Sequence, residues 1–211
     1  MNAVIGPAVC RNGKISCRVA ARMPRLAEAP HHGPARWRDR PAQKEITVPS
    51  STRRARRRDT PPPRTGGTEA ETLRGFLDYL RTSVAAKVEG APEPQVRTAG
   101  VPSGTNLLGL LCHLTFVERS MFLGEEVTDW QATFQAAASD GVDEVVARYR
   151  DAVERADEVL DRCADLGAPL PRPGRPSPSV RWALTHMVEE TGRHAGHADI
   201  LREQIDGATG R

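Results

Sequence analysis

The chain has 211 residues, of which 38% are hydrophobic and 27% are charged, enough for one ordinary domain with or without a tail. No apolar stretch approaches the roughly 20 residues that a membrane-spanning helix requires, and the first residues lack the regions of a secretory signal. We therefore expect a cytoplasmic protein. No disulfide framework or thiolate zinc site is predicted, because no CxxC spacing occurs among Cys10, Cys17, Cys112 and Cys163.

The formal net charge of +3 is unevenly distributed along the chain. Residues 1–67 carry 15 Arg and Lys against 4 Asp and Glu, whereas residues 68–211 carry 15 against 23. The first segment also contains 9 of the 17 prolines and shows no sustained apolar period. Such a segment cannot bury enough apolar area to offset its ordering entropy. We predict that residues 1–67 form a disordered basic arm and that residues 68–211 form the folded domain.

The arm ends in an arginine cluster made of Arg53, Arg54, Arg56, Arg57 and Arg58. Such a cluster favours salt-dependent binding to phosphate groups, so nucleic-acid or membrane-surface binding is an alternative function. Trp37 is the arm's single aromatic residue, which makes nucleic acid the weaker expectation. We favour a start assigned too far upstream, because 27 of the 30 basic residues are arginine, as in translated GC-rich DNA. Peptides from residues 1–50 in the native protein would contradict this explanation.

From Thr68 onward the apolar residues follow a helical period. A first helix is predicted from Thr68, which has capping-box spacing to Glu71, to a stop at Gly90. A second helix is predicted from residues 103–104 to Gly124, and a longer loop through Trp130 and Phe134 follows it. The chain then continues into two further helices.

The third helix is predicted from near Asp140 to Cys163. A proline-rich connector follows, and the fourth helix is expected to start with Ser177 as N-cap and Pro178 at its first position. It continues to about Ile205. No strand pattern competes, and each helix has one apolar stripe to bury, so the sequence predicts an all-α fold, a four-helix bundle.

Four of the six histidines lie in predicted helices, one in the second and three in the fourth. At about 100° per residue, one stripe at the margin of the fourth helix's apolar face contains His186, Glu190, His194 and His197. Imidazole and carboxylate groups four residues apart can bind one cation, and His113 is the obvious third ligand. The same spacing also fits a polar edge in which Glu190 pairs with an arginine.

Three segments together resemble the DinB-like superfamily, and more narrowly its actinobacterial mini-circle protein branch. They are SVRWALTHMVEETGRHAGHADILREQIDGATG from Ser179, PSGTNLLGLLCHLTFVERSMF from Pro102, and TLRGFLDYLRTSVAAKVEGAP from Thr72. The resemblance covers residues 68–210. It implies a four-helix bundle that binds a divalent metal through one His of the second helix and two residues four apart on the last. Several relatives are thiol transferases or isomerases that use mycothiol, bacillithiol or glutathione.

Carried over to this chain, the resemblance places metal ligands at His113 in CHLTFVE and at Glu190 and His194 in EETGRH. Many members have His where this chain has Glu190, whereas the mycothiol-dependent maleylpyruvate isomerases also use Glu. His186 and His197 then become candidates for the surroundings of the ligands or for the substrate side. Zinc is the expected metal, with nickel, manganese or iron as alternatives. Dimerisation through helix faces is implied by the resemblance alone.

The resemblance and the three-ligand set together predict a mycothiol-type S-transferase or isomerase that acts on small electrophiles. The metal would lower the pKa of the thiol and present a thiolate as nucleophile. We expect Arg193 and Arg202 to form a solvated face, with binding of an anionic substrate group as the alternative, and we expect Trp182 in the core. A non-catalytic metal-binding or stress-related bundle is the other alternative, and a fourth protein ligand from His186 or His197 would favour it.

Overall fold

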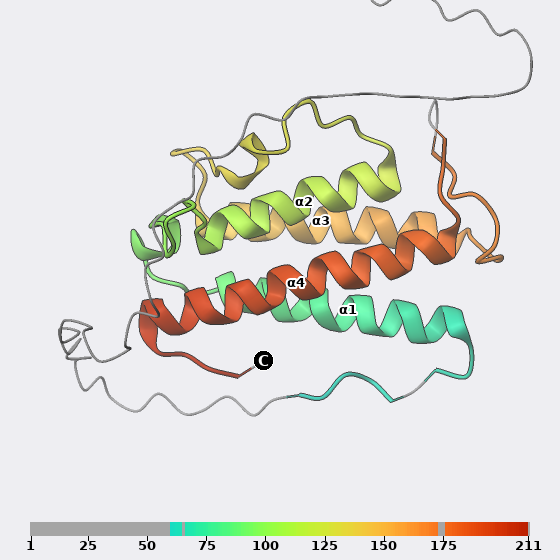
Figure 1. Ribbon diagram of the computed structural model, residues 1–211, viewed down its shortest axis with the longest axis horizontal. Helices are drawn as coiled ribbons and strands as arrows, with labels where there is room; N and C mark the ends of the chain where they lie inside the picture. Colours follow the sequence, from blue (N-terminus) through green and yellow to red (C-terminus); the bar gives the residue numbers. More distant parts are fainter. Residues whose placement is uncertain (1–59, 65, 173–175, 211) are drawn as a thin grey trace, which may run out of the picture. The chain divides into compact units, whose positions relative to one another are not determined.

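The computed structural model describes residues 60–64, 66–172 and 176–210, and their architecture is all-α. Four helices pack as a bundle (Figure 1): α1 (Glu69–Val88), α2 (Leu107–Leu123), α3 (Val142–Asp161) and α4 (Val180–Asp206). Two short 3₁₀ turns interrupt the connections, η1 (Gln95–Arg97) and η2 (Ala132–Phe134). The predicted fold class is confirmed. The prediction of a disordered arm falls, for residues 1–59, outside the part of the chain that is described.

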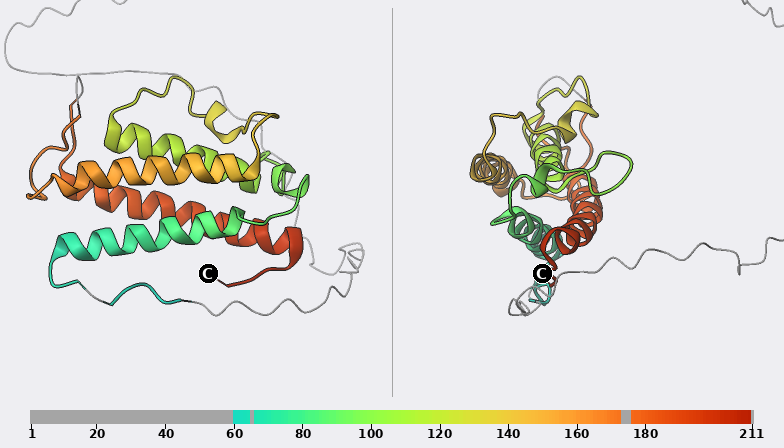
Figure 2. Two further views of the ribbon diagram at one scale, coloured as in Figure 1. Left: turned by 180° about the vertical axis from the view of Figure 1, so that it is seen from behind. Right: turned by 90° about the vertical axis from the view of Figure 1, so that its left-hand side faces the viewer.

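The helices form two parallel pairs that run in opposite directions (Figures 1 and 2). α1 packs mainly against α4, and α2 packs mainly against α3. Because α2 and α3 are parallel, the connection between them must return along the bundle, and it is this returning segment, residues 124–141, that carries η2 over α2. None of the helices in the described ranges is long and apolar enough to pass through a bilayer.

The helix ends follow from local hydrogen bonds. The predicted capping box of α1 is present, since the Thr68 hydroxyl accepts from the Glu71 N–H and the Glu71 carboxylate accepts from the Thr68 N–H. α2 begins later than predicted, with Asn106 rather than residues 103–104 at its N-terminus, because the Asn106 side chain accepts from the Gly109 N–H. It ends at Gly124, whose φ of 72° is in the left-handed region.

The prediction that α4 starts with Ser177 as N-cap is wrong. Backbone hydrogen bonds from Leu170 to the Pro178 carbonyl and from Val180 to the Ala168 carbonyl hold the connector extended through Pro178. The helix can therefore start only at Val180, and Ser179 is the N-cap, accepting from the Trp182 N–H. Trp182 is 53% exposed, so its predicted place in the core is also wrong.

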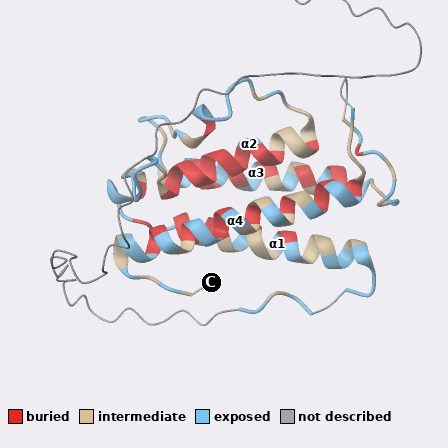
Figure 3. Cartoon of the chain, in the orientation of Figure 1, coloured by how far each residue is buried: buried red, intermediate tan, exposed pale blue. Residues whose placement is uncertain are grey.

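Buried apolar residues line the inward faces of all four helices, and α2 is buried along most of its length (Figure 3). The apolar face predicted for α4 is confirmed, apart from the half-buried Ile205, by the buried Val180, Ala183, Leu184, Met187, Thr191, Ala195, Ala198 and Leu201. The four stripes enclose two clusters of buried apolar residues, and each helix contributes to both. α2 is the most completely buried of the four helices.

One ion pair crosses this core. Both oxygens of Glu118 on α2, which is fully buried, accept hydrogen bonds from the guanidinium of Arg81 on α1, at 2.8 and 2.7 Å. Arg81 is 3% exposed and also donates to Asp78 and, on α3, Asp157. Burial raises the pKa of Glu118, but a carboxylate that accepts from two N–H groups of one guanidinium is in the geometry of an ionised pair. The pair ties three helices together.

Candidate metal centre

Three side chains from two helices converge at one point between α2 and α4. Oε1 of Glu190 lies 3.4 Å from Nε2 of His113 and 3.2 Å from Nε2 of His194. One ligand atom of each residue lies within 4.8 Å of those of the other two. The two α4 residues are one helical turn apart and border the buried stripe, while His113 comes from the buried helix α2. The structure therefore brings together the three predicted ligands.

These distances fit a divalent metal ion. Two ligand atoms each about 2.1 Å from a tetrahedral ion are about 3.4 Å apart, close to both measured separations. Two imidazole nitrogens and one carboxylate oxygen are a donor set that zinc, and several other divalent ions, accept. A set of three protein ligands also leaves a coordination position for a substrate or water.

A hydrogen-bond chain assigns the tautomer of His113. The Thr133 hydroxyl donates to the Trp130 carbonyl at 2.6 Å, so it can only accept from Nδ1–H of His113, 2.7 Å away. Nε2 of a neutral His113 therefore carries a lone pair that faces the Glu190 carboxylate. Two electron-rich atoms at 3.4 Å repel each other unless a cation lies between them. This arrangement suits a metal ligand whose other nitrogen is held by a supporting group.

Burial disfavours a protonated histidine as the source of the positive charge at this point. Desolvation lowers the pKa of His113 and of His194 below the ordinary imidazole value of 6.5, although the carboxylate of Glu190 opposes the shift. Nδ1 of His194 is buried and has no hydrogen-bond partner among the described residues, so this ring, unlike that of His113, has no supporting group. The donors are thus two neutral imidazoles and one carboxylate.

Thr133 is a site residue that the sequence reasoning missed. It belongs to η2, which the sequence predicts as loop, and its role depends on the fold of the returning connection. The aromatic residues of that loop were the available signal: the Phe134 ring stacks on His113 with centroids 3.8 Å apart, and the Trp130 ring meets it edge-on at 5.9 Å. The loop residues Trp130, Thr133 and Phe134 therefore hold His113 in place.

The Thr133→Val variant is expected to weaken metal binding by about 10-fold to about 100-fold, the range typical for losing a group that supports a ligating histidine. Valine has nearly the shape of threonine but cannot accept from Nδ1–H. Thr133→Ser keeps the hydroxyl and should bind zinc as the wild type does. Zinc titration by calorimetry measures both variants, and equal affinities for valine and serine would contradict the assigned role.

Gly109 allows η2 to lie on α2. A Cβ atom at this position would come 2.2 Å from the Phe134 carbonyl oxygen, a backbone atom that can move only with the whole turn. The glycine is one helical turn before His113, so the close approach of the turn brings Thr133 and Phe134 to the imidazole. Glycine at this point is a requirement of the site as well as of the fold.

Gly109→Ala is expected to displace η2, lower the free energy of unfolding by about 1–3 kcal/mol as overpacking does, and weaken zinc binding. Gly196→Ala on α4 is the matched control, because a Cβ there meets nothing within 4 Å. It should raise the free energy of unfolding by up to about 1 kcal/mol. Urea unfolding and zinc titration compare the two variants, and a Gly109→Ala chain with wild-type values would contradict the inferred contact.

A hollow of about 330 Å³ adjoins the converging side chains and is lined by His113, Val117, Ser120, Met121, Trp130, His186 and Glu190. His186 lines this hollow, is half-buried, and its ring stacks on Trp182 with centroids 4.9 Å apart. His197 is exposed, with its ring 5.5 Å from that of His194. Within the described residues neither histidine belongs to the converging group.

Two arginines considered as substrate-binding groups form ion pairs and hydrogen bonds within the chain. Arg202 is buried, which contradicts its predicted solvated position, and its guanidinium donates to the carbonyls of Lys87 and Glu89 and to Asp206. It joins α4 to the end of α1. Arg193 is exposed and pairs with Glu189, as the solvated-face interpretation predicted, and its guanidinium also lies 3.9 Å from Oε2 of Glu190.

The chain was compared with protein-family models and with curated proteins. The model of one family, described as Mycothiol-S-transferase, matches residues 72–207, which comprise most of α1 and every helix after it. No curated protein matches the chain. The matched range contains all three converging residues as well as the loop that supports His113.

Proposed function

Because the chain belongs to the mycothiol-S-transferase family, we propose that it is a metal-dependent enzyme that transfers the thiol of mycothiol to a small electrophile. One observation carries the proposal. Thr133 fixes the tautomer of His113, so that Nε2 of His113 and Nε2 of His194 both face Oε1 of Glu190. A divalent ion held by these groups would lower the pKa of a coordinating thiol and so supply the nucleophilic thiolate. Zinc suits this role best.

The residues that line the adjoining hollow would bind and orient the reactants. Val117, Met121 and Trp130 give the adjoining hollow apolar walls that exclude water from the sulfur and the electrophile, while the Ser120 hydroxyl and the His186 imidazole can orient polar groups. The thiol loses its proton to solvent, and sulfur forms a bond to the electrophilic carbon. The bond from that carbon to its leaving group breaks, and the leaving group departs with the electron pair.

A three-ligand set favours catalysis over a purely structural metal site, because structural zinc sites are usually closed by four protein ligands. The test uses the purified full chain, analysed for metal and assayed with mycothiol and a chloronitroaromatic electrophile. We expect about one divalent ion per chain and conjugate formation that requires both metal and thiol. Turnover that is undiminished without mycothiol would refute the proposal.

Metal affinity should depend on pH in a direction that the burial of the histidines fixes. Each imidazole must be neutral to bind the ion, and the pKa values of His113 and His194 lie below 6.5. Affinity is therefore expected to stay nearly constant from about pH 8 to about pH 6.5, and to fall at lower pH by up to about 100-fold per unit once both rings take up protons. Zinc titrations across this range measure it. A steep fall already above pH 7 would contradict the lowered pKa values.

A further inference from the structure

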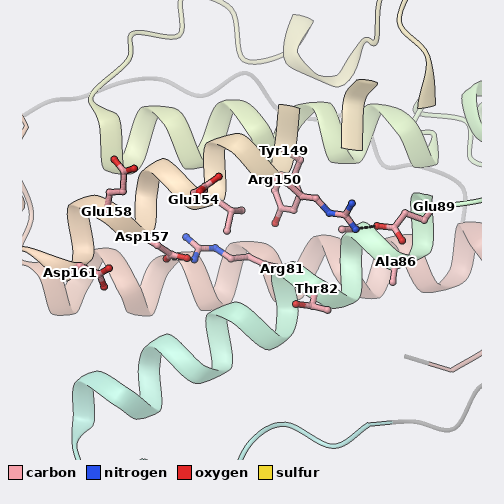
Figure 4. A pocket seen from close by; sticks show the side chains of 12 residues that line it. Arg81, Thr82, Ala86, Glu89, Tyr149, Arg150, Glu154, Asp157, Glu158 and Asp161 are labelled. Atoms are coloured by element: carbon pink, nitrogen blue, oxygen red, sulfur yellow. Dashed lines mark hydrogen bonds and ion pairs between the residues drawn. The ribbon is translucent and has the colours of Figure 1, made fainter. Parts of the chain in front are cut away.

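A second hollow lies between α1 and α3 and shares no lining residue with the metal centre. It is a groove of about 600 Å³ with the small side chains of Thr82, Ala85, Ala86 and Val153 along its floor. Its acidic residues are Glu89, Glu154, Asp157, Glu158 and Asp161, four of which project from α3 (Figure 4). We call it the acidic groove. The proposed metal-dependent reaction does not use the acidic groove.

Two of these five carboxylates lack a cation among the described residues. Asp157 and Asp161 pair with Arg81 and Arg74, and Glu89 pairs with Arg150. Glu154 and Glu158, one helical turn apart, form no ion pair with any residue in the described ranges. Neighbouring carboxylates on one helix face repel each other, and a bound cation would relieve that repulsion.

Tyr149 provides an independent sign that the groove lacks a partner. The side chain is 1% exposed and lines the groove, and its hydroxyl points from α3 toward α1 (Figure 4). The hydroxyl has no hydrogen-bond partner in the part of the chain that the structure describes. A buried hydroxyl without a partner is unfavourable. A guanidinium group fits this groove, because its N–H donors can reach the carboxylates while its alkyl stem covers the small side chains of Thr82, Ala86 and Val153.

The N-terminal segment of the chain leads toward the groove. Residues 60–67 run back alongside α1 (Figures 1 and 2). The Gly67 N–H donates to Glu71, a Cβ at Gly66 would lie 2.9 Å from Thr72, and a Cβ at Gly75 would lie 3.2 Å from Pro63. Each step toward the N-terminus thus moves further along α1. At about 100° per residue, the segment's contacts Glu71, Thr72 and Gly75 span about 100° of α1. Thr82, Ala86 and Glu89 of the groove fall within that arc, so the segment leads toward the groove.

The distances bring the arginine cluster to the groove. Five residues separate Pro63 from Arg58, which is about 16 Å of extended chain. α1 rises about 1.5 Å per residue, so 16 Å measured from Gly75 reaches about Ala86, in the groove. The residues upstream carry the cluster's other arginines, whereas residues 68–211 have a net charge of −8, from 15 basic and 23 acidic residues. We propose that the arginine cluster, residues 53–58, binds in the acidic groove of its own chain.

The test uses the full chain with the five arginines replaced by Gln, and a fluorescein-labelled peptide of residues 51–64 whose binding is followed by anisotropy. This chain should bind the peptide, and the wild type should bind it about 10-fold more weakly, since its own segment competes at a high effective concentration. Adding Glu154→Gln and Glu158→Gln should weaken binding about 5-fold. The matched control, Asp143→Asn with Glu203→Gln, removes two exposed charges elsewhere and should leave binding unchanged.

Equal peptide affinity for the wild type and the Gln-substituted chain would overturn the proposal, and so would equal losses from the groove pair and the control pair. An unmeasurable affinity for the Gln-substituted chain at low salt would overturn it as well. The variants leave the metal centre intact, so zinc content should be the same in all of them. If the wild-type chain binds no metal, the proposed enzyme function is refuted, but the peptide-binding result still stands.

Discussion

His194→Ala is expected to remove the bound metal and, with it, thiol-dependent turnover, while the helical bundle survives. His194 supplies one of only three converging ligand atoms, so its loss should weaken metal binding by more than the roughly 100-fold that follows from losing a supporting partner. Conjugate formation should fall toward the uncatalysed rate. Elemental analysis, circular dichroism and the mycothiol assay measure the three quantities.

His197→Ala is the matched control for that variant. His197 is on the same helix, three residues further on, and its ring lies beside that of His194, but it is exposed and outside the converging group. Metal content and turnover should remain near wild-type levels. If both variants lose metal equally, the ligand set is wrong; if neither does, the metal lies elsewhere.

Glu118→Ala is expected to lower the free energy of unfolding by about 3–5 kcal/mol, because it leaves the Arg81 guanidinium buried without its main partner. The guanidinium cannot escape the penalty by losing its proton, because arginine is basic enough to keep its charge at neutral pH even without a partner. Urea unfolding measures the loss. A decrease below about 1 kcal/mol would show that water reaches Arg81 in the folded chain.

The double variant Arg81→Met with Glu118→Leu separates two contributions to the free energy of unfolding: the cost of leaving Arg81 unpaired and the stabilisation that the ion pair itself provides. Replacing both partners of a buried pair by apolar groups is often neutral or stabilising. The double variant should therefore recover most of the stability that Glu118→Ala loses. A double variant as unstable as the single one would mean that the link to Asp157 on α3, rather than the buried charge, governs stability.

The helices and their buried faces could be predicted because each depends on local spacing. The apolar stripe of α4 was correct at nearly every position, and its polar edge placed Glu190 and His194 together. His113 needed a second argument, since no spacing within one helix reveals which neighbour completes a ligand set. The resemblance supplied that argument, and the structure brings His113 to the same point.

The features that were missed depend on contacts distant in sequence. Arg81 and Glu118 lie on the apolar stripes of their helices. Opposite charges on two such stripes indicate a buried ion pair, and this signal is missed when all charged residues are assumed to be exposed. Thr133 joins the site only because the returning connection fits against Gly109. The start of α4 at Ser179 depends on hydrogen bonds between two ends of a connector, which no capping preference could reveal.

X-ray absorption at the metal edge, recorded on the purified full chain before and after addition of mycothiol, tests the central claim most directly. The account predicts a centre bound by nitrogen and oxygen at about 2.0–2.2 Å, with a sulfur ligand appearing at about 2.3 Å when the thiol is added. His194→Ala should show neither signal. A metal whose spectrum does not change with mycothiol, or a chain that binds no metal after incubation with zinc or nickel, would contradict the proposed function.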